Sequence, residues 1–385
     1  MSMNYLRFSA SIFAIFLIIG IYVPFLPTWL EGRGLSPEQV GLVFAMALWA
    51  RIPIGLTLAA IAEHTGRRKP IIILASIGIL SGFYVFQFLD GYFALLIGWL
   101  IVGTLLTSVI PLVDSMVLLS VNSHNADYGR IRLWGSISFI AASVLGGYYL
   151  QGRGAETVLY MLIAASLFAV IASLGLPTIT TQPRRAKRLA MFDLLHSKRF
   201  VTFILTTATL QASHAALYGF ATISWLAAGI SESVVGMLWA EGVLAEIALF
   251  TFGRKIMKRF EVWQVLALAA VAGIIRWSVL GSTASLPWLV AVQGLHAFTF
   301  AATHLAAVIY ISREIPEDQS ATAQGMYDGV AMGLVFGVAM FLAGWAYEIH
   351  AAKAFYIMAL FSAGGIVGAI ALRRAHKSSG PTKLN

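Results

Sequence analysis

The chain has no cysteine among its 385 residues, and only 11% of the residues are charged. The first absence excludes disulfides, thiolate metal sites and cysteine nucleophiles, and it leaves the redox compartment open. The second sets the chain apart from soluble domains, in which about 25% of the residues are charged. Hydrophobic residues make up 59% of the sequence, and the mean hydropathy is +0.83. We therefore expect lipid rather than water to surround most of this protein.

Short motifs of enzymes and nucleotide-driven pumps are also missing. The sequence contains no H-E-x-x-H, no G-x-x-x-x-G-K-[ST] and no D-x-D loop. His296 and His304 lie eight residues apart in one apolar run, which is too far for them to share a metal ion unaided. We expect no enzymatic activity, no cofactor and no metal. Any uphill movement of a solute would then have to use an ion gradient.

Apolar runs long enough to cross a bilayer recur along the whole chain, since about 20 residues are needed for one crossing. The first run is too long for the core of a signal peptide and lacks a small-residue cleavage site, so we expect it to be retained. The sequence predicts an all-α membrane protein with twelve transmembrane helices. They are Phe8–Leu30, Val40–Ala62, Pro70–Leu89, Tyr92–Ser120, Leu133–Leu150, Thr157–Leu176, Phe200–Ala228, Val234–Phe252, Val262–Gly281, Leu286–Ser312, Ala323–Tyr347 and Ala354–Leu372.

The basic residues are distributed unevenly between the two sides of the predicted spans. One side holds 21 of the 26 Lys and Arg residues, whereas the opposite loops hold only Arg33, Arg153 and Lys353. Arg51 and Arg276 lie inside apolar runs. Because Lys and Arg concentrate in cytoplasmic loops, both termini are predicted to be cytoplasmic. The asymmetry also accounts for the net charge of +9, so we expect no nucleic acid as a partner.

One long connection divides the predicted spans into six and six. Residues 178–199 are basic and polar at first and then become amphipathic. They are either a flexible tether or a helix that lies on the anionic inner leaflet, and the composition favours the helix. The predicted organisation is a six-helix bundle over 1–177, a cytoplasmic linker over 178–199, and a second six-helix bundle with a short cytoplasmic tail over 200–385.

The two halves resemble each other in sequence. Five residues that begin the second span recur 195 positions later at the start of the eighth, namely Ser36, Val40, Gly41, Ala45 and Ala50 as Ser231, Val235, Gly236, Ala240 and Ala245. A few such matches can arise by chance between apolar segments, but their location at equivalent spans favours duplication. Parallel repeats of this kind place a substrate site near the middle of the membrane.

Several ionisable residues fall inside the predicted spans, where a charge costs roughly 2.5 to 3.5 kcal/mol by insertion scales. Helical spacing places Gln293, His296 and His304 of the tenth span within about 80° of one another. In the seventh span, Gln211, His214 and Tyr218 follow the i, i+3, i+7 spacing of one helix face. Each residue therefore needs a partner, a cavity or a function, and the candidates for proton coupling are Glu246, Glu241, Arg276, His296, His304 and Asp114.

Two alternatives stay open for these residues. A histidine in a span can simply hydrogen-bond between helices. Three histidines and two glutamates around one arginine favour a proton relay, because histidine titrates near neutral pH. Glu246 corresponds to Arg51 in the repeat, so the two can pair across a central cavity, or each can pair within its own half. In the fourth span, Pro111 can kink the helix next to Asp114.

Several segments together resemble an aromatic-acid transporter branch of the major facilitator superfamily. They are DYGRIRLWGS at 127–136, HAALYGF at 214–220, RW at 276–277, LPWL at 286–289 and HLAA at 304–307. This branch is similar to the proton-coupled sugar and nucleoside permeases, so the resemblance implies the major facilitator fold, proton symport and a bacterial inner membrane location. Of the superfamily signature after the second span, only Glu63, Gly66, Arg67 and Arg68 are present. In the similar lactose-type permeases, an acid, an arginine and a histidine of the eighth, ninth and tenth spans serve proton coupling.

A small aromatic carboxylate needs one cation and an apolar, aromatic wall. Arg51 with Tyr22, Trp239 and Phe220 can provide them, although such aromatics also pack helices together. The other substrate-binding candidates are Gln211, His214, Tyr218 and Gln293. The expected partners are protons, a small-molecule substrate and the lipid bilayer, and we expect a monomer. A sugar or nucleoside symporter, a drug/proton antiporter and a non-transporting membrane sensor remain alternatives.

Overall fold

The computed structural model describes residues 3–124, 128–179 and 190–378. Eleven stretches of helix in these residues are long and apolar enough to cross a membrane. One of them, Glu317–Ala375, has 59 residues and is about three times as long as the hydrocarbon core requires. It is divided at Ala351, whose φ of 49° ends one helix before a short 3₁₀ turn begins the next. The described part of the chain thus contains the twelve predicted spans.

The first six spans are single helices, and they run in the order predicted. Their bounds are α1 Met3–Gly32, α2 Pro37–Thr65, α3 Arg68–Phe86, α4 Tyr92–His124, α5 Tyr128–Leu150 and α6 Glu156–Leu174. The helix α4 continues through Pro111 without a break. The fourth span is therefore not interrupted at this proline, and a bend of the helix there stays a prediction.

Three of the last six spans are interrupted, which the apolar runs did not predict. The seventh consists of α8 Lys198–Ala212 and α9 Ala215–Ala227. The tenth consists of α12 Leu286–Gln293, the π-helix η1 Ala297–Ala302 and α13 Thr303–Glu314, and the eleventh of α14 Glu317–Tyr327, the π-helix η2 Asp328–Val335 and α15 Phe336–His350. The other three are α10 Glu232–Arg259, α11 Val262–Ser282 and α16 Phe355–Ser378, which follows the 3₁₀ turn η3 Ala351–Ala354.

Contacts between residues divide the chain into two compact units. The first unit contains Met1–Ala186 and Tyr218–Ala240, and the second contains Lys187–Leu217 and Glu241–Asn385. One continuous segment, from the end of the seventh span to the start of the eighth, thus groups with the first half of the sequence. The predicted division at 177 and 200, with a linker between, stays a prediction, and residues 180–189 of that linker lie outside the described residues.

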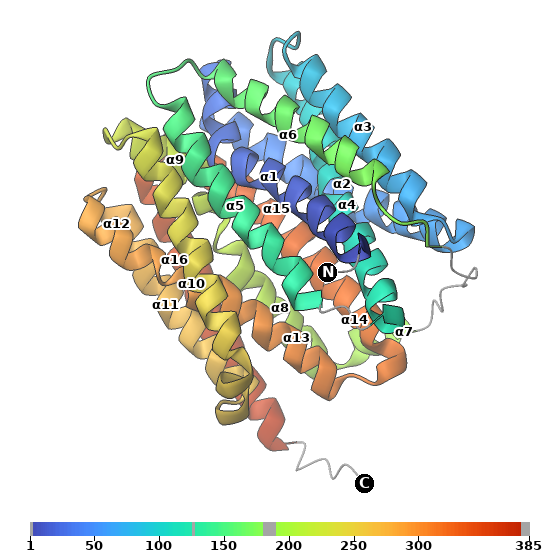
Figure 1. The fold of residues 1–385 in the computed structure, drawn as a ribbon. Helices are drawn as coiled ribbons and strands as arrows, with labels where there is room; N and C mark the ends of the chain where they lie inside the picture. Colours follow the sequence, from blue (N-terminus) through green and yellow to red (C-terminus); the bar gives the residue numbers. More distant parts are fainter. Residues whose placement is uncertain (1–2, 125–127, 180–189, 379–385) are drawn as a thin grey trace. The chain divides into compact units, whose positions relative to one another are not determined.

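In the first unit, α1 packs against α5 and α6, and α3 packs against α4 and α6 (Figure 1). The contact between α1 and α5 depends on Gly20. A Cβ atom at this position would lie 2.7 Å from the Cβ of Ala142 and 2.8 Å from the carbonyl oxygen of Phe139. The hydroxyl of Ser143 donates to the carbonyl of Gly20 over 3.1 Å. Small residues thus let the two helix backbones approach closely, as is common between transmembrane helices.

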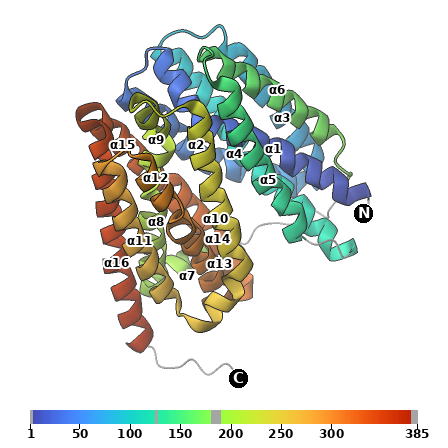
Figure 2. The same cartoon turned by 60° about the vertical axis from the view of Figure 1, so that its left-hand side comes forward.

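In the second unit, α16 packs against α11 and α8, and α8 also contacts η2. Figures 1 and 2 both show α11 and α16 side by side. Buried residues of α8 and α13 form part of the core, where the rings of Phe203 and Tyr310 stack with centroids 3.8 Å apart. Arg199 forms an ion pair with Glu314 at 2.8 Å beside this stack.

The helix α2 begins and ends at residues that suit a helix terminus. Ser36 begins α2 with a capping box, in which its hydroxyl accepts from the Gln39 backbone and its own backbone donates to the Gln39 side chain. The same helix ends at Gly66, whose φ of 65° is a conformation that glycine adopts without strain. Gly66 therefore allows the tight turn that leads into Arg67 and Arg68.

A short helix, α7 Ala190–His196, precedes the seventh span. Its Leu194 is buried in the core of the second unit, whereas Met191, Phe192 and Leu195 are between 43% and 60% exposed. A helix is thus present where the amphipathic end of the connection predicted one. Its place on the inner leaflet stays a prediction.

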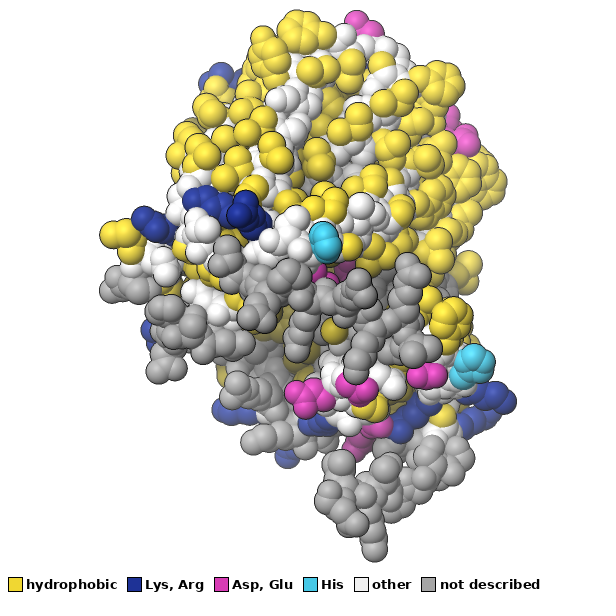
Figure 3. All heavy atoms as spheres, turned by 90° about the vertical axis from the view of Figure 1, so that its right-hand side faces the viewer, with side chains coloured by type: hydrophobic (Ala, Val, Ile, Leu, Met, Phe, Trp, Pro, Cys, Tyr) yellow, Lys and Arg dark blue, Asp and Glu magenta, His cyan; other side chains and the backbone are white. Residues whose placement is uncertain are grey.

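Large apolar side chains are exposed over much of the described surface. On the face shown in Figure 3, hydrophobic side chains cover a broad area, and Lys and Arg side chains gather beside it. The exposed fractions reach 73% for Phe93, 70% for Leu360 and 69% for Leu74. Contiguous apolar areas of this kind are rare on soluble monomers. They match the lipid contact that the composition predicted.

Candidate functional site

Arg276 of α11 is fully buried at the centre of a polar network in the second unit. One terminal nitrogen, Nη2, donates to Oε1 of Gln293 over 2.7 Å. The other, Nη1, donates to Nδ1 of His296 over 3.0 Å and to the hydroxyl of Thr299 over 2.9 Å. These three acceptors all come from the tenth span. The guanidinium fork thus joins α11 to the interrupted tenth span.

Glu246 extends the network to α10. Its Oε2 lies 3.8 Å from Nε2 of His296, and its side chain is 22% exposed whereas that of His296 is 8% exposed. Glu241 also interacts electrostatically with Arg276. One arginine, one histidine and two carboxylates are therefore gathered by three consecutive spans, the eighth, ninth and tenth.

The hydrogen-bond roles define where the proton of His296 lies. Arginine can only donate, so Nδ1 of His296 must accept the bond from Arg276. The ring is then neutral and carries its proton on Nε2, which faces Glu246. A second proton on His296 would have to enter at Nδ1 and would displace Arg276. Glu246 is thus the group of this pair that can take up a proton while Arg276 keeps its bonds.

A second arm of the network leads from Thr299 to His304. Nε2 of His214 lies 3.0 Å from the hydroxyl of Thr299, and Nδ1 of His214 lies 3.0 Å from the backbone carbonyl of Gln211. Nε2 of Gln211 donates to the hydroxyl of Tyr327 over 3.3 Å, and Nδ1 of His304 lies 3.3 Å from the same hydroxyl. The structure therefore brings together Gln211, His214, Gln293, His296, His304, Arg276 and Glu246.

Aromatic stacking supports the same face of the tenth span. The rings of His296 and Phe300 stack with centroids 5.2 Å apart, and those of Phe300 and His304 stack 6.5 Å apart. His214 contacts Phe300 edge-on at 5.7 Å. Residues 296, 300 and 304 follow the i, i+4, i+8 spacing of one helix face. Phe300 thus separates the two histidines of this span while holding both rings parallel.

The helix interruptions lie at the network itself. In the seventh span, the Ser213 hydroxyl donates to the carbonyl of Leu210 over 2.7 Å, and the His214 ring bonds the carbonyl of Gln211. Ser213 also accepts from Nε1 of Trp277 over 3.1 Å. Side chains thus satisfy backbone groups that a regular helix would pair, which is how a break is tolerated inside a membrane. In the tenth span, the π-helix η1 carries Thr299, and π-helical turns are frequent at functional sites.

The remaining candidates for substrate binding lie in the first unit, in two places. Tyr22 of α1 interacts electrostatically with Arg51 of α2, and its ring lies 5.3 Å from that of Trp99. Elsewhere in this unit, the rings of Tyr218 and Trp239 stack 5.8 Å apart, and Nε1 of Trp239 donates to the hydroxyl of Thr222 over 3.0 Å. Phe220 is fully buried in the same unit, and its place in a substrate site stays a prediction.

Asp114 has different neighbours from the other proton-coupling candidates. It hydrogen-bonds with Tyr128 and interacts electrostatically with Arg132, both of α5. The Arg132 guanidinium lies 4.3 Å from the ring centre of Phe16. Next to Asp114, the Ser115 hydroxyl accepts from Nε of Arg68 over 3.0 Å. Asp114 thus belongs to a cluster of α4 and α5 in the first unit.

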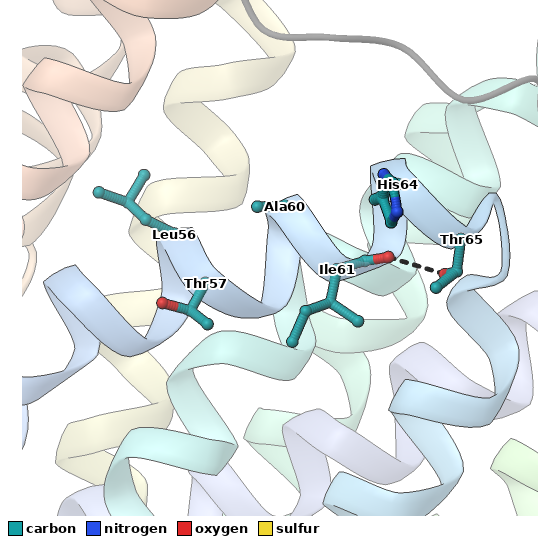
Figure 4. Close-up of a pocket in the computed structure, with 6 residues that line it drawn as sticks. All are labelled: Leu56, Thr57, Ala60, Ile61, His64 and Thr65. Atoms are coloured by element: carbon teal, nitrogen blue, oxygen red, sulfur yellow. Dashed lines mark hydrogen bonds between the residues drawn. The ribbon is translucent and has the colours of Figure 1, made fainter.

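A shallow hollow of about 480 Å³ runs along α2 (Figure 4). It is lined by Leu56, Thr57, Ala60, Ile61, His64 and Thr65. No residue among the predicted site residues borders it. Within the residues that the structure describes, no group of three His, Cys, Asp or Glu side chains is arranged to hold a metal ion.

Sequence reasoning missed Thr299, which joins the two arms of the network, and Tyr327, which links Gln211 to His304 in the second arm. Thr299 lies three residues after His296, so the polar stripe of the tenth span could have indicated it. Tyr327 belongs to the eleventh span, for which no polar stripe was considered. Its distance of 116 residues from Gln211 leaves no local signal for their bond.

Twelve apolar spans, interrupted helices and a buried network of ionisable residues are the features of a secondary transporter. The sequence matches the MFS_1 like family over residues 5–358. It is 33% identical over 355 residues to a probable 3-phenylpropionic acid transporter of Escherichia coli (strain K12), covering 90% of this chain and 92% of the relative. This chain belongs to the MFS_1 like family, and it is a multi-pass membrane transporter of the major facilitator type.

Other relatives share the fold at lower identity. A maltose permease of Geobacillus stearothermophilus is 25% identical, and the match covers 94% of this chain and 91% of the permease. The crystal structure of the nucleoside transporter NupG superposes with a TM-score of 0.83 at 18% identity, covering 98% of this chain and all of that one. These matches confirm the predicted fold class of two six-helix bundles.

Proposed function

We propose that this chain is a proton-coupled symporter of a small organic solute and that Glu246 carries the proton. The observation that supports this most directly is the position of the Glu246 carboxylate, 3.8 Å from the proton-bearing nitrogen of His296. Arg276 binds the other ring nitrogen and thereby keeps His296 from accepting a second proton. A carboxylate that is partly exposed on one side and faces this buried cluster on the other suits reversible protonation.

Protonation of Glu246 would remove one negative charge from the network, on the opposite side of the His296 ring from buried Arg276. That change alters the electrostatic energy of the network, and an alternating-access cycle needs such a difference between its loaded and empty forms. One charge that crosses the membrane is worth about 2.3 kcal/mol per 100 mV. Transport of a monoanion with one proton is electroneutral and would therefore depend on the pH gradient.

The proposed substrate is an aromatic monocarboxylate such as 3-phenylpropionate. The name of the Escherichia coli relative supports it. The first unit also holds a cation, Arg51, that interacts with Tyr22, and the Tyr22 ring lies beside that of Trp99. The maltose permease and the nucleoside transporter favour a sugar or a nucleoside as the second candidate. A drug/proton antiporter would move its substrate in the direction opposite to the protons, and a non-transporting sensor would show no flux, so transport measurements distinguish both from symport.

The proposal includes the orientation and the assembly of the chain. Both termini would lie in the cytoplasm of a bacterial inner membrane, because the basic residues gather on that side of the spans. The transporter would act as a monomer, with the solute and protons as its partners. Neither a metal nor a cofactor has a part in this cycle.

The test is uptake of labelled 3-phenylpropionate into proteoliposomes with an acidic outside solution. We expect accumulation that collapses when an ionophore removes the pH gradient. Glu246→Gln should abolish this uphill uptake and retain exchange between labelled and unlabelled substrate, because exchange needs no net proton movement. Glu317→Gln, which changes an exposed carboxylate, is the matched control and should transport normally.

Two results would contradict the proposal. Full uphill uptake by Glu246→Gln would remove this residue from proton coupling. No uptake by folded wild-type protein would exclude the aromatic acid, and the same assay with maltose and uridine would then test the second candidate. Substrate binding without any flux would indicate a sensor.

A further inference from the structure

We propose that an anionic phospholipid binds where the last turns of α16 meet the beginning of α11, with Trp263, Arg373 and Arg374 as its headgroup site. The inference goes beyond the proposed function, because it assigns a second binding site to a different class of molecule. It holds for any transported solute and for any proton pathway. The site lies in the second unit, in which α11 and α16 run side by side (Figures 1 and 2).

Arg373 and Trp263 join the two helices at this end. The guanidinium carbon of Arg373 lies over the Trp263 ring, 4.9 Å from its centre. Trp263 is half-buried and packs against the core of the second unit, so its indole is a fixed platform for a long, flexible side chain. An indole accepts no conventional hydrogen bond. The N–H groups of Arg373 can therefore donate to phosphate oxygens, which a guanidinium fork binds in a bidentate manner.

Two other arginines of this unit already have acceptors. Arg199 pairs with Glu314 at 2.8 Å, and Arg313 donates to the backbone carbonyl of Met257 over 3.2 Å. Within the parts of the chain that the structure describes, no carboxylate forms an ion pair with Arg373 or Arg374. The acid at the start of α11, Glu261, is exposed. Two neighbouring positive charges without an acidic partner suit an anionic ligand.

Arg374 ends a stripe of apolar side chains that faces away from the core. Leu360 and Val367 precede it at intervals of seven residues, which places all three within about 40° of one another on the helix. Leu360 is 70% exposed and Val367 is 69% exposed, whereas Ala369 and Leu372 of the same helix are buried in the core. Arg374 therefore lies on the face that contacts acyl chains, and its long side chain can extend from there to the headgroups.

The distance along α16 suits one phospholipid molecule. Val367 lies about 10 Å from Arg374 along the helix axis, within the ~15 Å that one leaflet contributes to the hydrocarbon core. A lipid whose phosphate meets the two arginines can thus lay its acyl chains over Val367. Free phosphate would gain only the contacts with the arginines, so the site is assigned to a lipid. The predicted orientation places it at the cytoplasmic leaflet, which carries anionic lipids.

The first experiment measures lipid binding by native mass spectrometry of the purified full chain, titrated with phosphatidylglycerol or with zwitterionic phosphatidylcholine. We expect Arg373→Gln/Arg374→Gln to weaken the binding of the tightest phosphatidylglycerol at least about tenfold, because each arginine near anionic headgroups contributes a factor of about five. Arg373→Lys/Arg374→Lys keeps both charges and should retain most of this binding. Binding of phosphatidylcholine should be weak and equal in all variants.

The matched control removes the same charge elsewhere on the side that is predicted to be cytoplasmic. Arg7 and Lys198 are both exposed there, and Arg7→Gln/Lys198→Gln should bind phosphatidylglycerol like the wild type. Equal weakening by the two double glutamine variants would show a general attraction to a basic surface and would overturn the proposal. Equal binding of both lipids by the wild type would overturn it as well.

The second experiment locates the lipid. Because the chain has no cysteine, Ala371→Cys gives a single thiol for a fluorophore on the exposed face between Val367 and Arg374. Spin-labelled phosphatidylglycerol should quench this fluorophore at lower concentration than spin-labelled phosphatidylcholine, and Arg373→Gln/Arg374→Gln should remove the preference. Leu145→Cys in α5, which is 66% exposed, should show no preference. The same preference at both positions would contradict a local site, and displacement of the lipid by an equal concentration of inorganic phosphate would exclude the lipid as its proper occupant.

Discussion

At the scale of single residues, Arg276 is the side chain on which the candidate site depends. It is fully buried, and its fork reaches three acceptors of the tenth span at distances between 2.7 and 3.0 Å. A guanidinium suits this position because it is planar and presents several donors in fixed directions. The charge is retained inside a membrane protein because neighbouring polar groups replace its water.

Replacing Arg276 by lysine should therefore not be conservative. An ammonium group on a flexible stem cannot reach Gln293, His296 and Thr299 with the same geometry, so some acceptors would lose their donor. We expect Arg276→Lys to destabilise the protein by at least about 2 kcal/mol, since each buried unsatisfied group costs about 1–3 kcal/mol. Thermal unfolding in detergent measures the change.

Arg153→Lys is the control for this substitution. Arg153 is exposed in a loop, where its guanidinium lies 4.2 Å from the ring centre of Tyr149. We expect the melting temperature of the Arg153→Lys variant to remain near that of the wild type. Equal melting temperatures for Arg276→Lys and the wild type would show that the fork does not hold the tenth span.

Part of this site could be predicted from the sequence. Ionisable residues in apolar runs are expensive, so Arg276, His296 and Glu246 stand out, and helical spacing places Gln293, His296 and His304 on one face. Thr299 did not stand out, because a threonine in a transmembrane helix usually bonds its own backbone, as Thr303 does. Its role depends on distances between spans, which spacing along one helix cannot give.

At the scale of the helices, apolar length predicted how many spans there are but not where they break. Hydropathy averages over the side chains of a window and contains no information on backbone pairing. The positions of proline do not predict the breaks either, because α4 continues through Pro111 while the seventh span breaks at Ser213 and His214, where there is no proline. That break is stabilised by side-chain bonds from Ser213 and His214 to the carbonyls of Leu210 and Gln211.

Close packing of α1 against α5 leads to a prediction for Gly20. In Gly20→Ala, the added Cβ would lie 2.7 Å from Ala142 Cβ and 2.8 Å from a backbone oxygen, so the helices would have to separate. We expect a destabilisation of about 1–3 kcal/mol, the usual cost of overpacking. The fraction of protein that remains monodisperse after heating in detergent measures it.

Gly364→Ala in α16 is the matched control. A Cβ atom at Gly364 would have no other atom within 4 Å, and alanine favours a helix over glycine by about 1 kcal/mol. This variant should be as stable as the wild type or more stable. If Gly20→Ala behaves in the same way, the close approach of α1 and α5 does not limit stability.

At the scale of the whole molecule, the two units that residue contacts define do not coincide with the first six and the last six spans of the sequence. The sequence suggests a division after six spans, whereas residues 218–240 group with the first unit and 187–217 with the second. An internal repeat shows which segments share an origin, and it does not show which segments pack together. Contacts of the seventh and eighth spans therefore could not be assigned from the repeat.

The absence of cysteine makes the predicted orientation directly testable, because one introduced cysteine is the only thiol in the protein. Gln151 lies in an exposed loop between the fifth and sixth spans, and Glu317 is exposed at the start of α14. Since Lys and Arg gather on the side of Glu317, we expect a membrane-impermeant maleimide to label Gln151→Cys in intact bacteria. Glu317→Cys should be labelled only after the membrane is permeabilised, and the wild type not at all. Labelling of Glu317→Cys in intact cells would reverse the orientation and place both termini outside.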